Sequence, residues 1–157
     1  MNGSIMNTND APVAKFATVF VTLKGKRYSM LMCKDFEGKA NISNQEVPRM
    51  GSVITGHKPT TIELSFTMTI YKCTEIFDDV VDEFIKTGVM PLLTIQTSNE
   101  DSATSVGRST KIYNDCVLDG EVLLSMAKSE DDFIEQEING YAGGYTRPEK
   151  FSNPAYM

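Results

Sequence analysis

The sequence TTIELSFTMTIY, residues 60–71, alternates between apolar and polar side chains almost without interruption. The apolar parity holds Ile62, Leu64, Phe66, Met68 and Ile70, and the polar parity holds Thr61, Glu63, Ser65, Thr67 and Thr69. Because successive side chains of a strand point to opposite faces of its sheet, this pattern predicts a β-strand with one apolar face and one polar face. The apolar face needs a core. A solvated surface and the lining of a pore would give the polar face the same sequence.

The size and charge of the chain limit what can surround this strand. Its 157 residues are enough for one domain, and 41% hydrophobic and 23% charged residues are typical of globular proteins. A net charge of -6 argues against binding to nucleic acid by neutralising phosphates. Residues 1–12 lack the pattern of a signal peptide, and no apolar run approaches a membrane span, so we expect cytosolic folding without a membrane anchor.

Further strands are predicted on both sides of the opening stretch. Residues 16–23 and 27–34 form a predicted hairpin about a turn at 24–26, and residues 110–118 and 121–127 form another about Asp119-Gly120. Single strands are predicted at 92–97 and 133–141. The predicted fold is mostly β: a one-domain antiparallel β-sandwich or barrel with one flanking α-helix. An N-terminal arm at 1–14 and a C-terminal extension at 142–157 complete the domain.

The helix is predicted at residues 74–86, where the hydrophobic period changes from two to between three and four. Thr74 is the expected N-cap, and Gly88 stands where a helix C-terminus belongs. The polar face of this helix is acidic, and Lys86 is its first basic residue. Such a face is usually solvated, but a concentration of like charge also suits a basic partner. A second acidic cluster lies within residues 130–137.

Residues 37–60 form a long polar segment interrupted by Gly38, Pro48, Gly51, Gly56 and Pro59. Such a length without clear periodicity is uncommon inside a compact domain. We therefore expect a loop or hairpin extension that serves a function or contacts a partner.

Residues suited to catalysis or metal binding are few. His57 is the only histidine and lies in a predicted loop, and Asn99-Glu100-Asp101 lacks the spacing of a calcium loop. Cys33, Cys73 and Cys116 are widely spaced and never form C-x-x-C, which favours reduced structural thiols over a zinc site. We expect no catalytic, metal or cofactor site, and the protein is not expected to be an enzyme.

The order of these elements resembles a known family. The stretches GHKPTTIELSFTMTIY, FDDVVDEFIKTG and PLLTIQTSNEDSATSVGRSTKIYNDCVLDGEVLLSMAKSEDDFIEQEI span Gly56 to Ile138. In that order they resemble the tail tube proteins of contractile phage tails, of the type found in PBSX-like prophages and in R-type, diffocin-like bacteriocins. The resemblance implies six subunits per ring, rings stacked into a hollow tube inside a sheath, and baseplate and terminator proteins at the tube ends. It places the protein in a virion tail or bacteriocin particle, assembled in the bacterial host cytoplasm.

The resemblance also implies roles for particular residues. The expected lumen lining is Thr61, Glu63, Ser65, Thr67, Thr69, Glu135 and Glu137. The expected sheath contact is the helix face of Glu75, Asp78, Asp79, Asp82 and Glu83. The expected extension between subunits or rings carries Asn41, Ile42, Val47, Pro48, Arg49, Met50, Val53 and Ile54. Six copies of the chain would carry a charge of -36 per ring, and an acidic lumen would repel the phosphates of passing DNA.

Two other functions remain open from the sequence. One is the tube of a type VI secretion system or another contractile injection system, which neighbouring genes would distinguish from a phage or bacteriocin. The other belongs to a different class: a small β-barrel that binds a hydrophobic ligand. That alternative predicts a monomer with an enclosed apolar pocket.

Overall fold

The structure is a computed structural model that describes residues 5–157, so the first four residues of the predicted N-terminal arm lie outside it. The elements run in the order η1 (Thr8–Asp10), β1 (Ala17–Leu23), β2 (Lys26–Ser29), β3 (Cys33–Val47), β4 (Gly56–Tyr71), α1 (Ile76–Thr87), β5 (Leu93–Glu100), β6 (Arg108–Asp119), β7 (Glu135–Ala142) and β8 (Gly144–Glu149). Strands dominate and α1 is the only α-helix within the described residues, which confirms the predicted mostly β fold.

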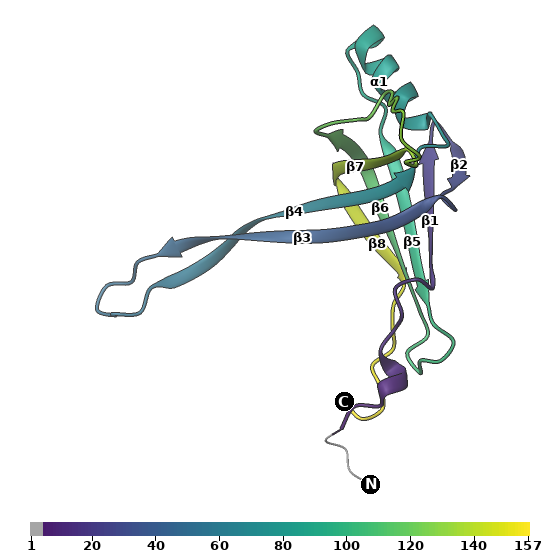
Figure 1. Ribbon diagram of the computed structural model, residues 1–157. Helices are drawn as coiled ribbons and strands as arrows, with labels where there is room; N and C mark the ends of the chain where they lie inside the picture. Colours follow the sequence, from purple (N-terminus) through teal and green to yellow (C-terminus); the bar gives the residue numbers. More distant parts are fainter. Residues whose placement is uncertain (1–4) are drawn as a thin grey trace.

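The strands pair in the order β2-β1-β5-β6-β7-β4-β3, with β8 also on β6, and every pair is antiparallel. The sheet folds over into two layers that share β6 (Figure 1). We call the layer of β3, β4, β7 and the end of β6 the polar-faced sheet. The second layer contains β1, β2, β5, the start of β6, and β8. The C-terminus and η1 lie at the end of the molecule opposite α1 (Figure 1).

The core lies between the two layers and is closed at one end by the helix. Phe66, Met68 and Ile70 of β4 are buried there, as the alternation in residues 60–71 predicts. They pack with Val21 and Ile95 from the second layer. The helix adds the buried side chains Ile76, Phe77 and Val80. Burying these side chains is the main source of stability for a domain of this size.

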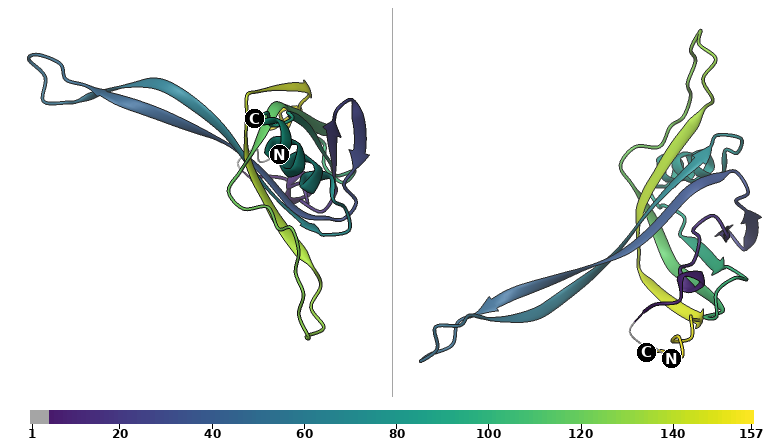
Figure 2. Two further views of the ribbon diagram at one scale, coloured as in Figure 1. Left: turned by 90° about the horizontal axis from the view of Figure 1, so that it is seen from above. Right: turned by 60° about the horizontal axis from the view of Figure 1, so that its bottom comes forward.

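The opening strand extends further than its core. Leu64 is half-buried and Ile62 is 61% exposed, because β7 accompanies β4 only from Leu64 onward. Beyond that point β3 and β4 continue as a two-stranded hairpin that projects far from the sandwich (Figures 1 and 2). Most of residues 37–60 lie in this hairpin, where β3 and β4 stay paired as far as Val47 and Gly56 and residues 48–55 form the tip.

Two sequence predictions for the chain after Asp119 are wrong. Residues 121–127 form no strand; instead β7 pairs with the end of β6, in a register that aligns Val117 with Tyr141. Residues 120–134 leave the sheet as a narrow open loop (Figure 2). The predicted C-terminal extension contains β8, which continues the path of β7 along β6 after a kink at Gly143. The tail therefore completes the second layer.

The helix is bounded almost as predicted. Gly88 adopts φ 74° and its N–H donates to the Phe84 carbonyl at 2.9 Å, which is the left-handed stop expected of a C-terminal glycine. The predicted N-cap is wrong: Glu75 occupies the cap position without a side-chain hydrogen bond, and Thr74 lies one residue too early. Because Glu75 does not cap the helix with its side chain, the first N–H groups of α1 donate no hydrogen bond to the cap residue's side chain.

Candidate functional site

The outer face of the polar-faced sheet collects the polar parity of three strands. Thr67 of β4 lies opposite Glu37 of β3 on one side and Asn139 of β7 on the other. Thr69 lies opposite Asp35 and Glu137 in the same way. Because facing residues of antiparallel strands point to the same side, these rows form one continuous polar surface, with the core on its reverse. We call this surface the polar sheet face.

The predicted lining residues fall into two groups on this surface. Ser65, Thr67, Thr69, Glu135 and Glu137 lie in the sheet, where β4 and β7 pair. Thr61 and Glu63 lie beyond the end of β7, on the projecting part of the β3–β4 hairpin, and both are exposed. The sheet therefore brings five of the seven predicted residues into one wall.

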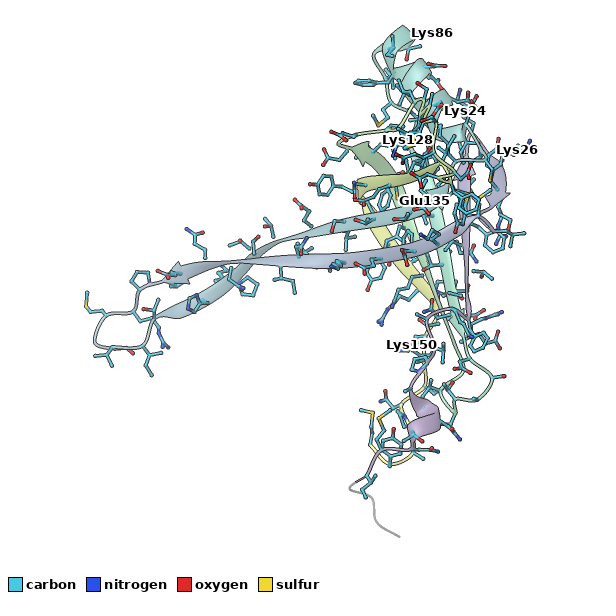
Figure 3. The ribbon with its side chains drawn as sticks, in the orientation of Figure 1. Lys24, Lys26, Lys86, Lys128, Glu135 and Lys150 are labelled. Carbon is cyan, nitrogen blue, oxygen red and sulfur yellow. The ribbon has the colours of Figure 1, made fainter. Side chains whose placement is uncertain are left out.

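Hydrogen bonds and one ion pair order the wall. Thr67 Oγ1 donates to Asn139 Oδ1 at 2.9 Å, and Asn139 Nδ2 donates to Glu137 Oε1 at 3.2 Å. Lys34 Nζ lies 3.0 Å from Glu135 Oε1, and this carboxylate raises the pKa of Lys34. Figure 3 marks Glu135 where β7 begins. One of the three predicted acidic lining residues thus has its charge balanced within the subunit, whereas Glu63 and Glu137 have no ion-pair partner among residues 5–157.

Five charged residues of the polar sheet face were not predicted from sequence: Lys34, Asp35, Glu37 and Lys39 of β3, and Asp119 of β6. The sequence does contain a pattern that could have predicted three of them. In residues 33–43, Asp35, Glu37 and Lys39 share one parity, and the apolar Phe36 and Ala40 share the other. Glycine, alanine and charged residues weaken that apolar parity, so the strand reads as a polar loop. With them the face carries six carboxylates and two lysines, so it stays acidic.

The tip of the β3–β4 hairpin is apolar and exposed. Met50 and Val53 are fully exposed, and Val47 and Ile54 also face solvent. The tip is nevertheless ordered: Arg49 Nη2 donates to the Ile54 carbonyl at 3.1 Å, and the Ile54 N–H donates to Ser52 Oγ at 3.1 Å. Within residues 5–157, no other element lies beside the outer part of this arm (Figure 3). An apolar tip on an ordered arm is typical of a contact surface.

The acidic helix face divides into paired and free carboxylates. Asp78 lies 2.9 Å from Lys72 Nζ, and the two side chains are only 17% and 7% exposed. Glu83 forms an ion pair with Lys24. Glu75, Asp79 and Asp82 are exposed, and no basic side chain among residues 5–157 lies within ion-pair distance of them. The predicted sheath-contact surface is therefore smaller than the sequence suggests, because Asp78 points inward.

Only the first half of the helix's apolar stripe is buried against the sandwich. Phe84 is 46% and Ile85 is 74% exposed, and Val89 just beyond the helix is also exposed. The reason is visible in Figure 1, where the second half of α1 extends past the end of the sandwich. Lys86 lies at this outer end (Figure 3).

Other kinds of site find little support in the described residues. No three His, Cys, Asp or Glu side chains of residues 5–157 gather in a way that would hold a metal ion. No helix in this part of the chain is long and apolar enough to cross a bilayer. A groove of about 820 Å³ opens between β1 and β3, and charged residues such as Lys34, Asp35 and Lys111 line it. This groove is not the enclosed apolar pocket that a hydrophobic ligand requires.

Comparisons with known sequences and structures agree with one another. Residues 4–149 match the family model described as phage tail tube protein. XkdM of the PBSX phage-like element of Bacillus subtilis strain 168 is 28% identical over 124 residues, which cover 79% of this chain and 84% of XkdM. YqbM of the same strain is also 28% identical, over 69% of this chain and 74% of YqbM.

Solved structures show the same fold at low identity. A chain of the tube-terminating cap of the anti-feeding prophage superposes with a TM-score of 0.66 at 13% identity, covering 96% of this chain and 99% of that one. A chain of the sheath–tube complex of the PVC extracellular contractile injection system gives 0.63 at 14% identity, covering 91% and 98%.

Proposed function

The chain belongs to the phage tail tube protein family, and from this premise we propose that six copies form a ring and that rings stack into the inner tube of a contractile tail. The observation that carries the proposal is the polar sheet face, a polar wall that faces solvent and is backed directly by the core. In a closed ring the wall becomes the lining of the lumen.

The geometry of a closed ring suits this role. Each subunit supplies four strands of the polar-faced sheet. Six subunits would supply about 24 strands; with strands about 4.8 Å apart and tilted about 40°, the barrel would be roughly 48 Å across at the backbone. Such a lumen is wider than a DNA duplex. Closure would also remove the exposed sheet edges, which otherwise invite aggregation.

The charge of the polar sheet face gives the lumen a function. Glu63 and Glu137, together with Asp35, Glu37 and Asp119, outnumber the lysines of that face. We propose that the acidic lining repels DNA phosphates, so that a passing genome does not adhere to the wall. Thr67 and Thr69 add small hydroxyl groups without large side chains that would narrow the lumen.

The two projecting surfaces have proposed partners. The β3–β4 hairpin, with Asn41, Ile42, Pro48 and the tip residues, would bridge to a neighbouring subunit or ring and bury its apolar tip there. The exposed carboxylates Glu75, Asp79 and Asp82 would meet a basic surface of the sheath protein. Baseplate and terminator proteins would bind the two ends of the tube, and assembly would take place in the bacterial host cytoplasm.

A second candidate is the tube of an extracellular contractile injection system or a type VI secretion system. The structural likeness to chains from the anti-feeding prophage and PVC particles favours keeping it. The same subunit architecture would serve, with a protein cargo in place of DNA. Genes beside this one decide between the two: capsid and terminase genes indicate a phage, and their absence indicates a bacteriocin or injection system. Either way the proposed role is structural and not enzymatic.

Electron microscopy of the purified protein tests the proposal. We expect six-fold rings and stacked tubes from the wild type, but only monomers or single rings after deletion of residues 41–54. A protein that remains monomeric at high concentration and in the presence of its sheath and baseplate would contradict the ring. Long tubes formed by the deletion variant would contradict the bridging role of the hairpin alone.

The sheath contact has a separate test. Reversal of charge at Asp79 and Asp82, both exposed, should weaken co-assembly with the sheath while leaving naked tubes intact. Reversal at Glu130 and Asp131, which are exposed and not on the helix, is the matched control. Unchanged sheath binding by the Asp79/Asp82 variant would mean that the acidic helix face is only solvated.

A further inference from the structure

The polar-faced sheet has two edges without a strand partner within residues 5–157: β3 on one side and the end of β6 on the other. They differ in length and charge from β2, the edge strand of the second layer. The edge strand β2 has four residues, of which Lys26 and Arg27 are basic, and short basic edge strands resist unwanted pairing. The edge strand β3 has fifteen residues and pairs only with β4. Between bulges at Cys33/Asp35 and Ser43/Asn44 it is regular, so Asp35–Ser43 offers an unbroken row of backbone groups on its outer side.

The opposite edge of the same sheet is the end of β6. Only Val117, Leu118 and Asp119 pair with β7, and the other side of these three residues has no strand partner, because β5 reaches only to Cys116. The chain then passes through Gly120 into residues 121–127. As a strand in the ring, β6 would be too short to cover the regular stretch of β3. The missing length must come from the residues that follow.

Residues 121–127, EVLLSMA, place Val122, Leu124 and Met126 on one parity, as a strand with an apolar face would, but lack backbone partners. Within residues 5–157 their backbone makes no hydrogen bond to another backbone group. The one recorded partner is Lys72 Nζ, which donates to the Leu123 carbonyl at 2.7 Å. Leu124 is 56% exposed, although it is an apolar residue. A segment with an alternating apolar parity, mostly free backbone groups and an exposed leucine is suited to pairing with another chain.

Strand direction identifies the partner. The four strands β3, β4, β7 and β6 are antiparallel to their neighbours, so the first and the last run in opposite directions. When copies of the chain are related by rotation about a ring axis, β3 of one therefore lies antiparallel to β6 of the next. An odd number of strands would have forced a parallel joint. The two stretches are also similar in length, residues 35–43 against residues 117–127, or about 30 to 37 Å at 3.4 Å per residue.

We propose that residues 117–127 of one copy pair antiparallel with Asp35–Ser43 of the neighbouring copy, and that residues 121–127 become a strand only in the assembled ring. This inference rests on the proposed ring function and names the pairing that closes it. The Lys72 contact fixes Leu123 in the free subunit and so limits the conformations that the segment must lose on pairing. The sequence pattern that predicts a strand at 121–127 then describes the assembly and not the isolated subunit.

Hydrogen exchange compares unassembled subunits with assembled tubes of the full chain. We expect amides in residues 121–127 and in residues 35–43 to become protected together on assembly, slowing by roughly a hundredfold or more where a new backbone hydrogen bond forms. Tubes in which residues 121–127 exchange as fast as in the free subunit would overturn the pairing while leaving the ring function intact. Failure to form any ring or tube would contradict the ring function, and the pairing with it.

A matched pair of proline variants tests the same inference independently. Ser125→Pro removes a backbone donor inside the segment, and Ser129→Pro makes the same change outside it; both serines are exposed and neither lies in a strand of the subunit. We expect both variants to melt at the wild-type temperature as subunits. Only S125P should lose tube assembly, by at least tenfold in the fraction pelleted. Equal assembly of both variants would overturn the proposal.

Discussion

At the scale of single residues, two glycines set how closely the strands approach. A Cβ at Gly140 would meet the Val117 carbonyl oxygen, and it would lie 2.7 Å from Cζ of Phe66. A Cβ at Gly38 would meet the hydroxyl group of Tyr113 and lie 2.7 Å from its Cζ. Only a residue without a side chain fits at either place, because backbone and ring atoms cannot move aside cheaply. These glycines join β7 to β6 and β3 to the second layer.

Gly140→Ala should lower the free energy of unfolding by about 3 kcal/mol, the upper range for overpacking, because the clash includes a backbone oxygen of the paired strand. Chemical denaturation of the subunit measures this. Gly144→Ala is the control, since nothing lies within 4 Å of a Cβ at that position, and it should change stability by less than about 1 kcal/mol. Equal effects of the two substitutions would contradict the close approach of β6 and β7.

The three cysteines should differ in reactivity. Cys73 is exposed, Cys33 is half-buried and Cys116 is fully buried. Burial raises the pKa of Cys116 to about 12 and also raises the pKa of Cys33. Because the thiolate is the reactive form, we expect a thiol reagent at pH 8 to modify Cys73 first, Cys33 slowly and Cys116 only after unfolding. Three equal rates in the native subunit would show that the core opens readily.

At the scale of elements, one nearly buried ammonium group joins four segments. Lys72 follows β4, and its Nζ contacts Asp78 of α1 at 2.9 Å, Gln136 of β7 at 2.9 Å and the Leu123 carbonyl of the β6–β7 connection at 2.7 Å. All three of its donors are therefore used. A buried charge without partners would destabilise the fold, so full pairing is what allows the Lys72 ammonium group to be buried.

Lys72→Met should destabilise the subunit by about 3 kcal/mol, because Asp78 would be left as a largely buried charge without a partner. Lys34→Met removes the partner of Glu135 from an exposed pair and should cost less than about 1 kcal/mol. Thermal or chemical unfolding of both variants makes the comparison. A Lys72 variant no less stable than the Lys34 variant would mean that water reaches Asp78 freely.

The elements also show what the sequence could and could not predict. The strand at 60–71 and the stop at Gly88 follow from local rules, because alternation and a left-handed glycine need only a few neighbouring residues. The sequence leaves residues 37–60 open as a loop or a hairpin, since Gly38 and Lys39 interrupt the pattern of β3 and its pairing with β4 spans a long hairpin. β8 was missed because its place along β6 depends on the kink at Gly143, a tertiary feature. In the predicted sheath contact, the sequence could not show that Asp78 points inward to Lys72, because that ion pair joins the helix to the residue after β4.

At the scale of the whole molecule, the subunit has an architecture that makes most sense in an assembly. Its sandwich core is ordinary, but the β3–β4 hairpin, the outer half of α1 and the β6–β7 connection all extend away from it (Figures 1 and 2). Exposed apolar side chains gather on these three projections, among them Met50, Ile85 and Phe133. Exposed apolar patches of this kind are typical of interaction surfaces. In the proposed tube they would form contacts within and between rings.

The central claim is that the polar sheet face lines the lumen of the tube. Cryo-electron microscopy of tubes assembled from the purified protein, or taken from whole particles, tests it most directly. We predict six subunits per ring, with Thr67, Thr69 and Glu137 on the inner wall and α1 on the outside toward the sheath. A tube in which these three residues lie on the outer surface or between rings would contradict it.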